Sequence, residues 1–179
     1  MNHPPIPDYI ADFIQATQIP LTLTCPRISD DPVIKTNDAF LRMSEYTESE
    51  VVGHNCRFLQ GAQTKSDARR RIRKALQSSG DFQIVLRNYR KSGTTFDNFL
   101  FIFPILGGDD QAVFNLGAQF EIPASGQTDA LLRFADVLKD GLEGLNSERK
   151  SLRQSPIEYR QLTEMSPKSL VLTRIKSSV

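Results

Sequence analysis

The sequence predicts an α+β domain built on one antiparallel sheet that packs against helices on one face. Two short segments with alternating apolar and polar residues come first, several amphipathic helical segments follow, and three longer strand-like segments joined by short turns come last. Consecutive strands joined by short turns pair as an antiparallel meander, and helices then cover the sheet. At 179 residues and 39% apolar content, the chain is long enough for one such domain with additional elements.

The chain begins with an amphipathic segment, and we expect a helix over residues 8–17 with Asp8 as its N-cap. Residues 21–25 alternate between apolar and polar side chains, which predicts a strand, and a second short strand is expected at residues 32–36. The apolar face of the first helix must pack on another element. It consists of Tyr9, Ile10, Phe13 and Ile14.

Helical segments occupy the middle of the chain. Asn37 is placed to cap one helix, and Thr47, followed three residues later by Glu50, matches the capping box of the next. The longest of these helices is expected over residues 64–79, with Gly80 ending it in a left-handed conformation. Its apolar face is formed by Ala68, Ile72, Ala75 and Leu76.

Three strands are expected next, at residues 82–89, 94–104 and 112–122. Glycine, serine and aspartate dominate the connections at residues 91–93 and 107–110, and these residue types favour tight turns. Together with the two early strands they predict a sheet of five strands.

A boundary is expected at residues 123–126, where the sequence is Pro-Ala-Ser-Gly. A helix is expected over residues 129–152, in which apolar residues recur at alternating spacings of four and three, with Arg149 interrupting the row. Gly141 and Gly144 weaken this helix by roughly 1 kcal/mol each relative to alanine. The apolar row consists of Leu131, Ala135, Leu138, Leu142, Leu145 and Leu152.

This apolar row has two interpretations. It can pack on the sheet of the same chain, or it can meet a second copy; because an apolar stripe left in water marks an interface, we favour a homodimer contact through the terminal helices. Ser-Pro pairs at residues 155–156 and 166–167 each predict the start of a short helix. The chain then divides into an N-terminal cap helix at residues 1–19, a core at 20–122 and a C-terminal helical extension at 123–179.

Composition argues against several classes of protein. The formal net charge is only +1, which gives no reason to expect a nucleic-acid or membrane-surface partner. No apolar run approaches the roughly 20 residues that cross a bilayer, and the first residues lack the apolar core of a secretory signal. The two cysteines, Cys25 and Cys56, are therefore expected to be reduced thiols in a cytoplasmic protein, and their spacing does not match a structural zinc site.

The most informative segment is residues 53–61, Gly-His-Asn-Cys-Arg-Phe-Leu-Gln-Gly, which sets a thiol beside two amides and an arginine. Arginine donates two parallel hydrogen bonds to a phosphate, and Arg73 offers a second such group. Amide side chains both donate and accept, which suits a heterocycle whose edge alternates C=O and N–H groups. Three amides lie on the predicted late strands, at Asn88, Asn98 and Gln119. The pattern predicts a phosphorylated heteroaromatic ligand without identifying it.

Residues 55–60, Asn-Cys-Arg-Phe-Leu-Gln, resemble the signature of LOV (light-oxygen-voltage) photoreceptor domains, a branch of the PAS fold. The resemblance extends over roughly residues 20–121 and includes segments 88–93, 96–98 and 116–119. It implies a five-stranded antiparallel sheet with helices on one face, plus N- and C-terminal helical extensions.

The resemblance also implies a flavin cofactor, FMN, with FAD or riboflavin as alternatives. By this resemblance Cys56 attacks the flavin C4a carbon after blue light, Asn88 and Asn98 bind the pyrimidine edge, and Gln119 lies next to N5. Protonation of N5 is thought to reorient the Gln119 amide and so pass the signal into the sheet. An apolar site disfavours the thiolate, so the Cys56 thiol is expected to stay protonated in the dark.

The remaining site residues follow from the same resemblance. Arg57 and Arg73 are expected to bind the FMN phosphate, and Asn55 and Gln60 to contact the ribityl or phosphate part. Thr24 is also assigned to the cofactor site. The apolar wall is expected to consist of Leu59, Ile72, Leu76, Leu86, Leu100, Ile102 and Gly117.

Three positions depart from the family pattern. Asn115 stands where an aromatic residue is common beside the flavin, Arg69 where an apolar residue is common, and Cys25 where an aspartate is frequent. We expect Cys25 to act as a small buried hydrophobe and His54 to lie at the surface.

The resulting hypothesis is a blue-light photoreceptor that is not an enzyme and that signals through flanking helices, with a rearrangement of its dimer. The alternative is a light-regulated DNA-binding regulator that uses the two short C-terminal helices, although nucleic acid is the less favoured partner. An enzyme with Cys56 as nucleophile is disfavoured, because the neighbouring sequence supplies no base to activate the thiol. No metal site and no membrane contact are expected.

Overall fold

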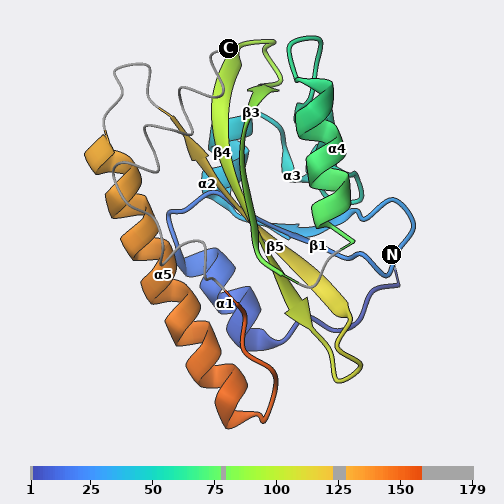
Figure 1. Cartoon of the computed structure of the whole chain (residues 1–179), viewed down its shortest axis with the longest axis vertical. Helices are drawn as coiled ribbons and strands as arrows, with labels where there is room; N and C mark the ends of the chain where they lie inside the picture. Colours follow the sequence, from blue (N-terminus) through green and yellow to red (C-terminus); the bar gives the residue numbers. More distant parts are fainter. Residues whose placement is uncertain (1, 78–79, 123–127, 159–179) are drawn as a thin grey trace.

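The computed structural model describes residues 2–77, 80–122 and 128–158 (Figure 1). Five antiparallel strands form one sheet in the order β2-β1-β5-β4-β3. The strands are β1 (Leu21–Thr24), β2 (Val33–Thr36), β3 (Phe82–Tyr89), β4 (Thr95–Leu106) and β5 (Ala112–Glu121). The helices are α1 (Asp8–Ala16), α2 (Asp38–Ser44), α3 (Glu48–Val51), the 3-10 helix η1 (Cys56–Leu59), α4 (Ser66–Ala75) and α5 (Thr128–Ser151). The predicted α+β class and the five strands are confirmed.

The capping predictions are confirmed in the middle of the chain but not at its start. The Asn37 side chain accepts a hydrogen bond from the Phe40 N–H and caps α2, and Glu50 accepts from the Thr47 N–H at 3.0 Å. Asp8, in contrast, is the first residue of α1, and Pro7 is its N-cap. The helix predicted over residues 64–79 is shorter in the structure, where α4 ends at Ala75, and residues 78–79, which would join it to Gly80, lie outside the described residues.

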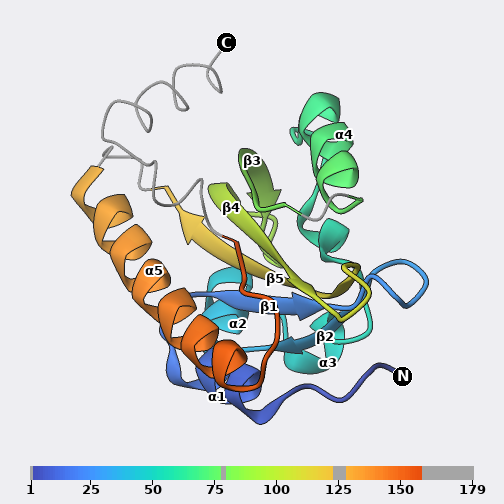
Figure 2. The ribbon, with the colours of Figure 1, turned by 60° about the horizontal axis from the view of Figure 1, so that its bottom comes forward.

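Helices cover both faces of the sheet, in agreement with the predicted core helices on one face plus terminal helical extensions. Side chains of a strand point alternately to the two faces. On β4, Phe99, Phe101 and Phe103 are buried against α1 and α5, while the residues between them face α4 and η1. Figures 1 and 2 show α1 and α5 side by side on one side of the sheet and α4 on the other.

The apolar row of α5 packs within its own chain, which contradicts the predicted dimer seam. Its members between residues 131 and 145 belong to the same core cluster as the phenylalanines of β4 and are at most 7% exposed. Only Leu152, at the end of the row, is exposed, at 54%. The physical reason is the second face of the sheet: its aromatic side chains need a cover, and α5 supplies it.

The contact between the two terminal helices depends on a glycine. A Cβ atom at Gly141 of α5 would lie 2.3 Å from Cε2 of Phe13 on α1. Gly141 therefore allows α1 to approach α5 closely.

Beyond α5, residues 154–158 are not helical, so the short helix predicted from Pro156 does not begin there. Ile157 is 1% exposed and packs into the main core. Asn146 of α5 holds it by two hydrogen bonds, accepting from the Ile157 N–H at 2.6 Å and donating to its carbonyl at 2.9 Å. The second predicted short helix, at residues 166–167, and the boundary at 123–126 lie outside the described residues.

Arg149, which interrupts the apolar row, is 2% exposed and forms its own junction. Its guanidinium donates to the carbonyls of Ser155 and Leu106, at 2.6 and 3.0 Å, and to the Tyr9 hydroxyl at 3.3 Å. It thus joins α5 to α1, to the end of β4 and to the segment after α5.

Among the helices that the structure describes, none has the length and apolar character needed to cross a membrane.

Candidate functional site

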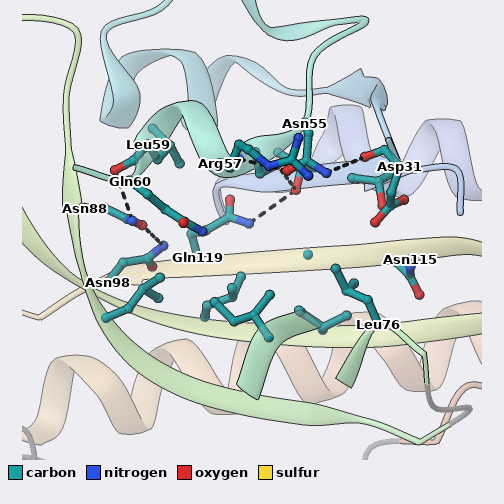
Figure 3. A pocket seen from close by; sticks show the side chains of 18 residues that line it. Asp31, Asn55, Arg57, Leu59, Gln60, Leu76, Asn88, Asn98, Asn115 and Gln119 are labelled. Carbon is teal, nitrogen blue, oxygen red and sulfur yellow. Dashed lines mark hydrogen bonds between the residues drawn. The ribbon is translucent and has the colours of Figure 1, made fainter. Parts of the chain in front are cut away.

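A pocket lies between the sheet and the η1–α4 layer, on the face opposite α1 and α5 (Figure 3). Its volume is about 620 Å³, a figure that includes space open to solvent. Its lining residues are Thr22, Thr24, Asp31, Asn55, Cys56, Arg57, Leu59, Gln60, Ile72, Leu76, Leu86, Asn88, Asn98, Leu100, Ile102, Asn115, Gly117 and Gln119. Every residue predicted for the site lines this pocket except Arg73.

The local fold of η1 brings Cys56 to the pocket. Asn55 caps η1 by accepting from the Arg57 N–H at 3.0 Å, and its amide nitrogen donates to the Asp30 carbonyl at 2.6 Å. Both ends of the Asn55 amide therefore bind the protein backbone, which anchors η1 to the loop between β1 and β2. Cys56 is the first residue of η1 and lines the pocket directly after this anchor.

The Cys56 thiol is held in its neutral form. Burial raises the pKa of Cys56 to about 12, and the nearby negative charge of Asp31 adds to the rise. The Thr22 hydroxyl, 4.0 Å from the Cys56 sulfur, acts in the opposite direction as a hydrogen-bond partner. A thiol with this pKa is a poor nucleophile near neutral pH, in keeping with the predicted protonated dark state.

Three amides from neighbouring strands meet at one end of the pocket, as Figure 3 shows. Asn98 donates to the Asn88 side-chain oxygen at 2.9 Å, and Asn88 donates to the Leu59 carbonyl at 3.2 Å. The side-chain oxygens of Asn98 and Gln119 are buried and have no hydrogen-bond partner in the described structure. Because unpaired buried acceptors cost free energy, this end of the pocket favours a ligand that donates hydrogen bonds.

Thr22 is a site residue that sequence reasoning missed. Gln119 donates from Nε2 to the Thr22 hydroxyl at 3.3 Å, and Thr22 is 2% exposed. A Cβ atom at Gly117 would lie 2.8 Å from this hydroxyl, so only glycine leaves room for the contact. The alternation of β1 offered the signal, because Thr22 and the predicted Thr24 share one face of that strand.

The opposite end of the pocket holds two more residues outside the predicted set, Asp31 and Asn115 (Figure 3). Burial raises the pKa of the Asp31 carboxyl above its ordinary value, and Asp31 has a positive φ of 48°. One Asp31 oxygen, the Asn115 amide nitrogen and the Thr24 hydroxyl are buried without a hydrogen-bond partner in the described structure. The sequence marks Asn115 as unusual. It gives no signal for Asp31, which reaches the pocket only through the path of the loop between β1 and β2.

The arginines predicted for phosphate binding differ in position. Arg57 lines the pocket and forms an ion pair with Asp30 at 2.5 Å, with its side chain 58% exposed. Arg73 is exposed on α4 and does not line the pocket, because the apolar face of that helix turns Ala68 and Ala75 toward the protein. Arg69 does not line the pocket either, and its guanidinium donates to the Gly61 carbonyl. Cys25 is fully buried in the opposite core, and His54 is exposed, as predicted.

These residues fit a flat heteroaromatic group such as the expected flavin. Apolar side chains from α4, β3 and β4 form the walls, Gly117 leaves the sheet surface open, and unpaired amide oxygens await donors at one end. Across the described ranges no group of three or more His, Cys, Asp or Glu side chains could hold a metal ion. The arrangement can bind a planar ring and hold a neutral thiol beside it.

Comparison with known proteins agrees with this geometry. The PAS domain family matches residues 22–122. A blue-light-activated histidine kinase of Erythrobacter litoralis is 37% identical over 108 residues, which are 60% of this chain and 30% of the kinase. Phototropin-2 of Oryza sativa is 34% identical over 112 residues, 63% of this chain and 12% of the phototropin. The chain thus spans less than a third of each of these two relatives.

Solved structures extend the similarity to most of the chain. The LOV protein of Rhodobacter sphaeroides superposes with a TM-score of 0.72 and 37% identity, covering 76% of this chain and 80% of that one. A variant described as RsLOV d2 gives a TM-score of 0.78 and 33% identity, with 94% of both chains covered. A light-oxygen-voltage domain studied with a flavin analogue gives a TM-score of 0.59 and 37% identity, over 66% of this chain and 88% of that one.

Proposed function

Since this chain belongs to the LOV branch of the PAS domain family, we propose that it is a blue-light photoreceptor whose pocket binds FMN and whose Cys56 bonds to that flavin on illumination. The observation that carries the proposal is the position of Cys56: a neutral thiol lines an apolar pocket that also presents unpaired amide oxygens. The family and the blue-light role rest on the comparisons. The adduct, the preference for FMN and the output are proposals.

The protein contributes position and polarity, and the cofactor contributes the photochemistry. A bound flavin would supply the photochemistry: its excited C4a=N5 double bond would take up the S–H group of Cys56, with the sulfur on C4a and the proton on N5. One S–H bond and one C=N π bond would then be replaced by one S–C bond and one N–H bond. Burial keeps Cys56 protonated until then. Asn98 would offer its free oxygen to the ring N–H of the pyrimidine edge, while Asn88 orients Asn98, and Gln119 would offer its free oxygen to the proton that N5 gains on illumination.

Arg57 is the proposed partner of the FMN phosphate, because it lines the pocket and its side chain reaches solvent. To bind a phosphate it must leave or share its ion pair with Asp30, an exposed pair that contributes little to stability. Arg73 is exposed on the neighbouring helix, and its predicted phosphate contact stays a prediction. FAD and riboflavin remain alternatives that a binding titration with the three flavins decides.

Absorption spectra before and after blue light test the main proposal. The purified chain with bound FMN should be yellow, bleach under blue light and recover in the dark. Cys56→Ala should bind the flavin and stay yellow. Cys25→Ala is the matched control, because it removes the other free thiol from the opposite core and should bleach like the wild type. A chain that stays colourless with excess FMN, or a Cys56→Ala variant that still bleaches, overturns the proposal.

The proposed output passes through the terminal helices, which pack on the back of the strands that line the pocket. A homodimer, if formed through them, cannot use the buried row of α5. The outer face of α5 offers Val137, 55% exposed, and Leu152 instead. Light scattering of the protein in darkness and under blue light measures its mass, and an unchanged mass excludes formation or dissociation of a dimer as the output, whereas an unchanged small-angle scattering profile excludes a rearrangement within the dimer.

The relatives that are histidine kinases match this chain over less than half of their length, so their enzymatic activity is not transferred to it. We propose a sensor that is itself not an enzyme. The alternative of a DNA-binding regulator loses one of its two helices at residues 154–158, where the chain is not helical.

A further inference from the structure

Thr22 occupies the point where the reactive thiol and the Gln119 amide meet. Its hydroxyl accepts from the Gln119 Nε2 at 3.3 Å and from the Cys56 sulfur at 4.0 Å. The side chain is 2% exposed on β1, and a β-branched residue in a strand has little rotational freedom. The oxygen of Thr22 is therefore fixed in space between these two partners.

A hydroxyl accepts two hydrogen bonds and donates one. Gln119 and Cys56 use the acceptor capacity of Thr22, which leaves the hydroxyl proton free to rotate toward another acceptor. The Gln119 side-chain oxygen, at the other end of the same amide, is buried and has no partner in the described structure. If the amide turned over, this oxygen would face Thr22, and the hydroxyl could donate to it. Thr22 can thus bind the Gln119 amide in either orientation.

We propose that Thr22 is a positioning residue that couples the bonding state of Cys56 to the orientation of the Gln119 amide. This inference rests on the proposed function. When Cys56 forms its S–C bond, its S–H bond is broken, the proton moves to the flavin, and the sulfur no longer donates to Thr22. The hydroxyl then needs a new arrangement, and donation to the Gln119 oxygen supplies it. The thiol and the amide are linked through the protein as well as through the cofactor.

The sheet geometry supports this coupling. Thr22 and Gly117 are paired across β1 and β5, and Gln119 lies two residues beyond Gly117 on the same face. A Cβ atom at Gly117 would lie 2.8 Å from the Thr22 hydroxyl and 3.0 Å from the Gln119 Nε2. The neighbours of Thr22 on β1, Leu21 and Leu23, are fully buried in the core shared with α1 and α5. A change in the hydrogen bonds of Thr22 therefore acts on β1, the strand whose opposite face packs against α1 and α5.

The test compares Thr22→Val, which removes the hydroxyl with little change of shape, with Thr22→Ser, which keeps it. Both are loaded with FMN, and the side-chain amide of Gln119 is followed by light-minus-dark infrared spectroscopy with isotope-labelled glutamine. Thr22→Val should bleach but lose at least half of the Gln119 amide signal, and Thr22→Ser should restore it. Thr36→Val is the control: Thr36 pairs with Thr22 on β2 and is equally buried, but its hydroxyl donates to the Leu21 carbonyl and does not line the pocket.

A second measurement uses the FMN-loaded protein in the dark. Exchange of the Gln119 side-chain N–H protons, followed by NMR, should be roughly fivefold faster in Thr22→Val, the factor that corresponds to about 1 kcal/mol for one neutral hydrogen bond. If Thr22→Val does not bind FMN, Thr22→Ala against Thr22→Ser gives the same comparison.

The outcomes separate the two proposals. An unchanged Gln119 signal in a hydroxyl-free variant that bleaches overturns the role of Thr22 and leaves the photoreceptor proposal intact. A signal lost equally in Thr36→Val overturns it as well, because the effect would then follow from any buried hydroxyl. A wild-type chain that binds FMN but never bleaches overturns both.

Discussion

Single residues give the pocket two polar ends of different character. The end formed by Asn88, Asn98 and Gln119 is neutral and holds its amides by hydrogen bonds to each other, to Thr22 and to the backbone. The end formed by Asp31 and Asn115 includes an acidic group, and burial raises the pKa of the Asp31 carboxyl. Its ionised form is therefore disfavoured in the folded chain, which gives this residue a pH-dependent effect on stability.

Asp31→Asn should stabilise the flavin-free protein at neutral pH. A carboxyl whose pKa is raised on folding contributes stability that is fully present below the unfolded value of 3.8 and is lost as the pH rises through the folded value. The difference in the free energy of unfolding between Asp31→Asn and wild type should thus grow as the pH rises above 3.8 and then level off once the pH exceeds the raised pKa. Asparagine also tolerates the positive φ at this position.

Urea unfolding between pH 3 and 8 measures this gap. Asp109→Asn is a control of opposite sign, because the Gln111 N–H and Arg27 lower the pKa of the exposed Asp109 carboxyl. The variant should match the wild type in acid and lose stability as the pH rises. A constant gap for Asp31→Asn over the whole range would contradict the effect of burial.

Most residues of the pocket could be predicted from the sequence, because residues 55–60 and the segments at 88–93, 96–98 and 116–119 resemble LOV domains and the resemblance implies their roles. The apolar row through Ala68, Ile72 and Ala75 turns Arg73 toward solvent and out of the pocket wall, and its contact with the phosphate stays a prediction. Asp31 reaches the pocket through two consecutive positive-φ residues in its loop, and a conformation of that kind has no periodicity to predict it from.

At the scale of helices and strands, the terminal helices α1 and α5 form one layer over the back of the sheet. Asn37 ties this layer to the strands: it accepts from the Leu21 N–H at 3.0 Å and donates to the carbonyls of Ile14 and Ile19, at 3.0 and 2.7 Å. Its capping role was visible in the sequence. Its contacts with α1 and β1 were not, because they join residues more than 15 positions apart.

Gly141→Ala should destabilise the protein although alanine is the better helix former. The added Cβ would lie 2.3 Å from the Phe13 ring, so α1 or the ring must move, and overpacking of this kind costs typically 1–3 kcal/mol. Gly144→Ala is the matched control, because no atom lies within 4 Å of the added Cβ, and it should gain up to about 1 kcal/mol.

Thermal or urea unfolding of the two variants distinguishes packing from helix propensity. Equal stabilisation of both would mean that α1 does not press on α5 at Gly141. Combining Gly141→Ala with Phe13→Ala should recover part of the loss, since the smaller side chain removes the ring that the added Cβ would meet.

The mistaken dimer seam has an instructive physical cause. Spacings of four and three show that one side of a helix is apolar, but they do not show which surface covers it. The alternating phenylalanines of β4 form a second apolar surface, on the back of the sheet, that also needs a cover. The apolar row of α5 and this surface can cover each other within one chain, which favours the intramolecular interpretation over a dimer contact.

Considered as a whole, the molecule uses the two faces of one sheet for two purposes. The pocket occupies one face and the helical layer the other, so Thr22, Gly117 and Gln119 face the pocket on the same strands whose next residues face α1 and α5. Arg149 closes the assembly at one end by joining both helices, β4 and the segment after α5.

Arg149→Met should loosen this end of the molecule. The variant keeps an unbranched apolar side chain but leaves the carbonyls of Ser155 and Leu106 without their donor, at a cost of roughly 2–3 kcal/mol. Hydrogen exchange should rise at the end of α5 and around Leu106, while flavin binding on the other face stays unchanged. Arg133→Met, at an exposed position of α5, should leave both stability and exchange unaltered.

The attachment of Ile157 has a practical consequence for anyone who wishes to place another protein under optical control with this chain. The two hydrogen bonds between the Ile157 backbone and the Asn146 side chain fix the position at which the chain leaves the folded core beside α5. An effector domain fused directly after Glu158 would be held at that position relative to α5. A flexible spacer inserted at the same junction would let the effector domain move away from it.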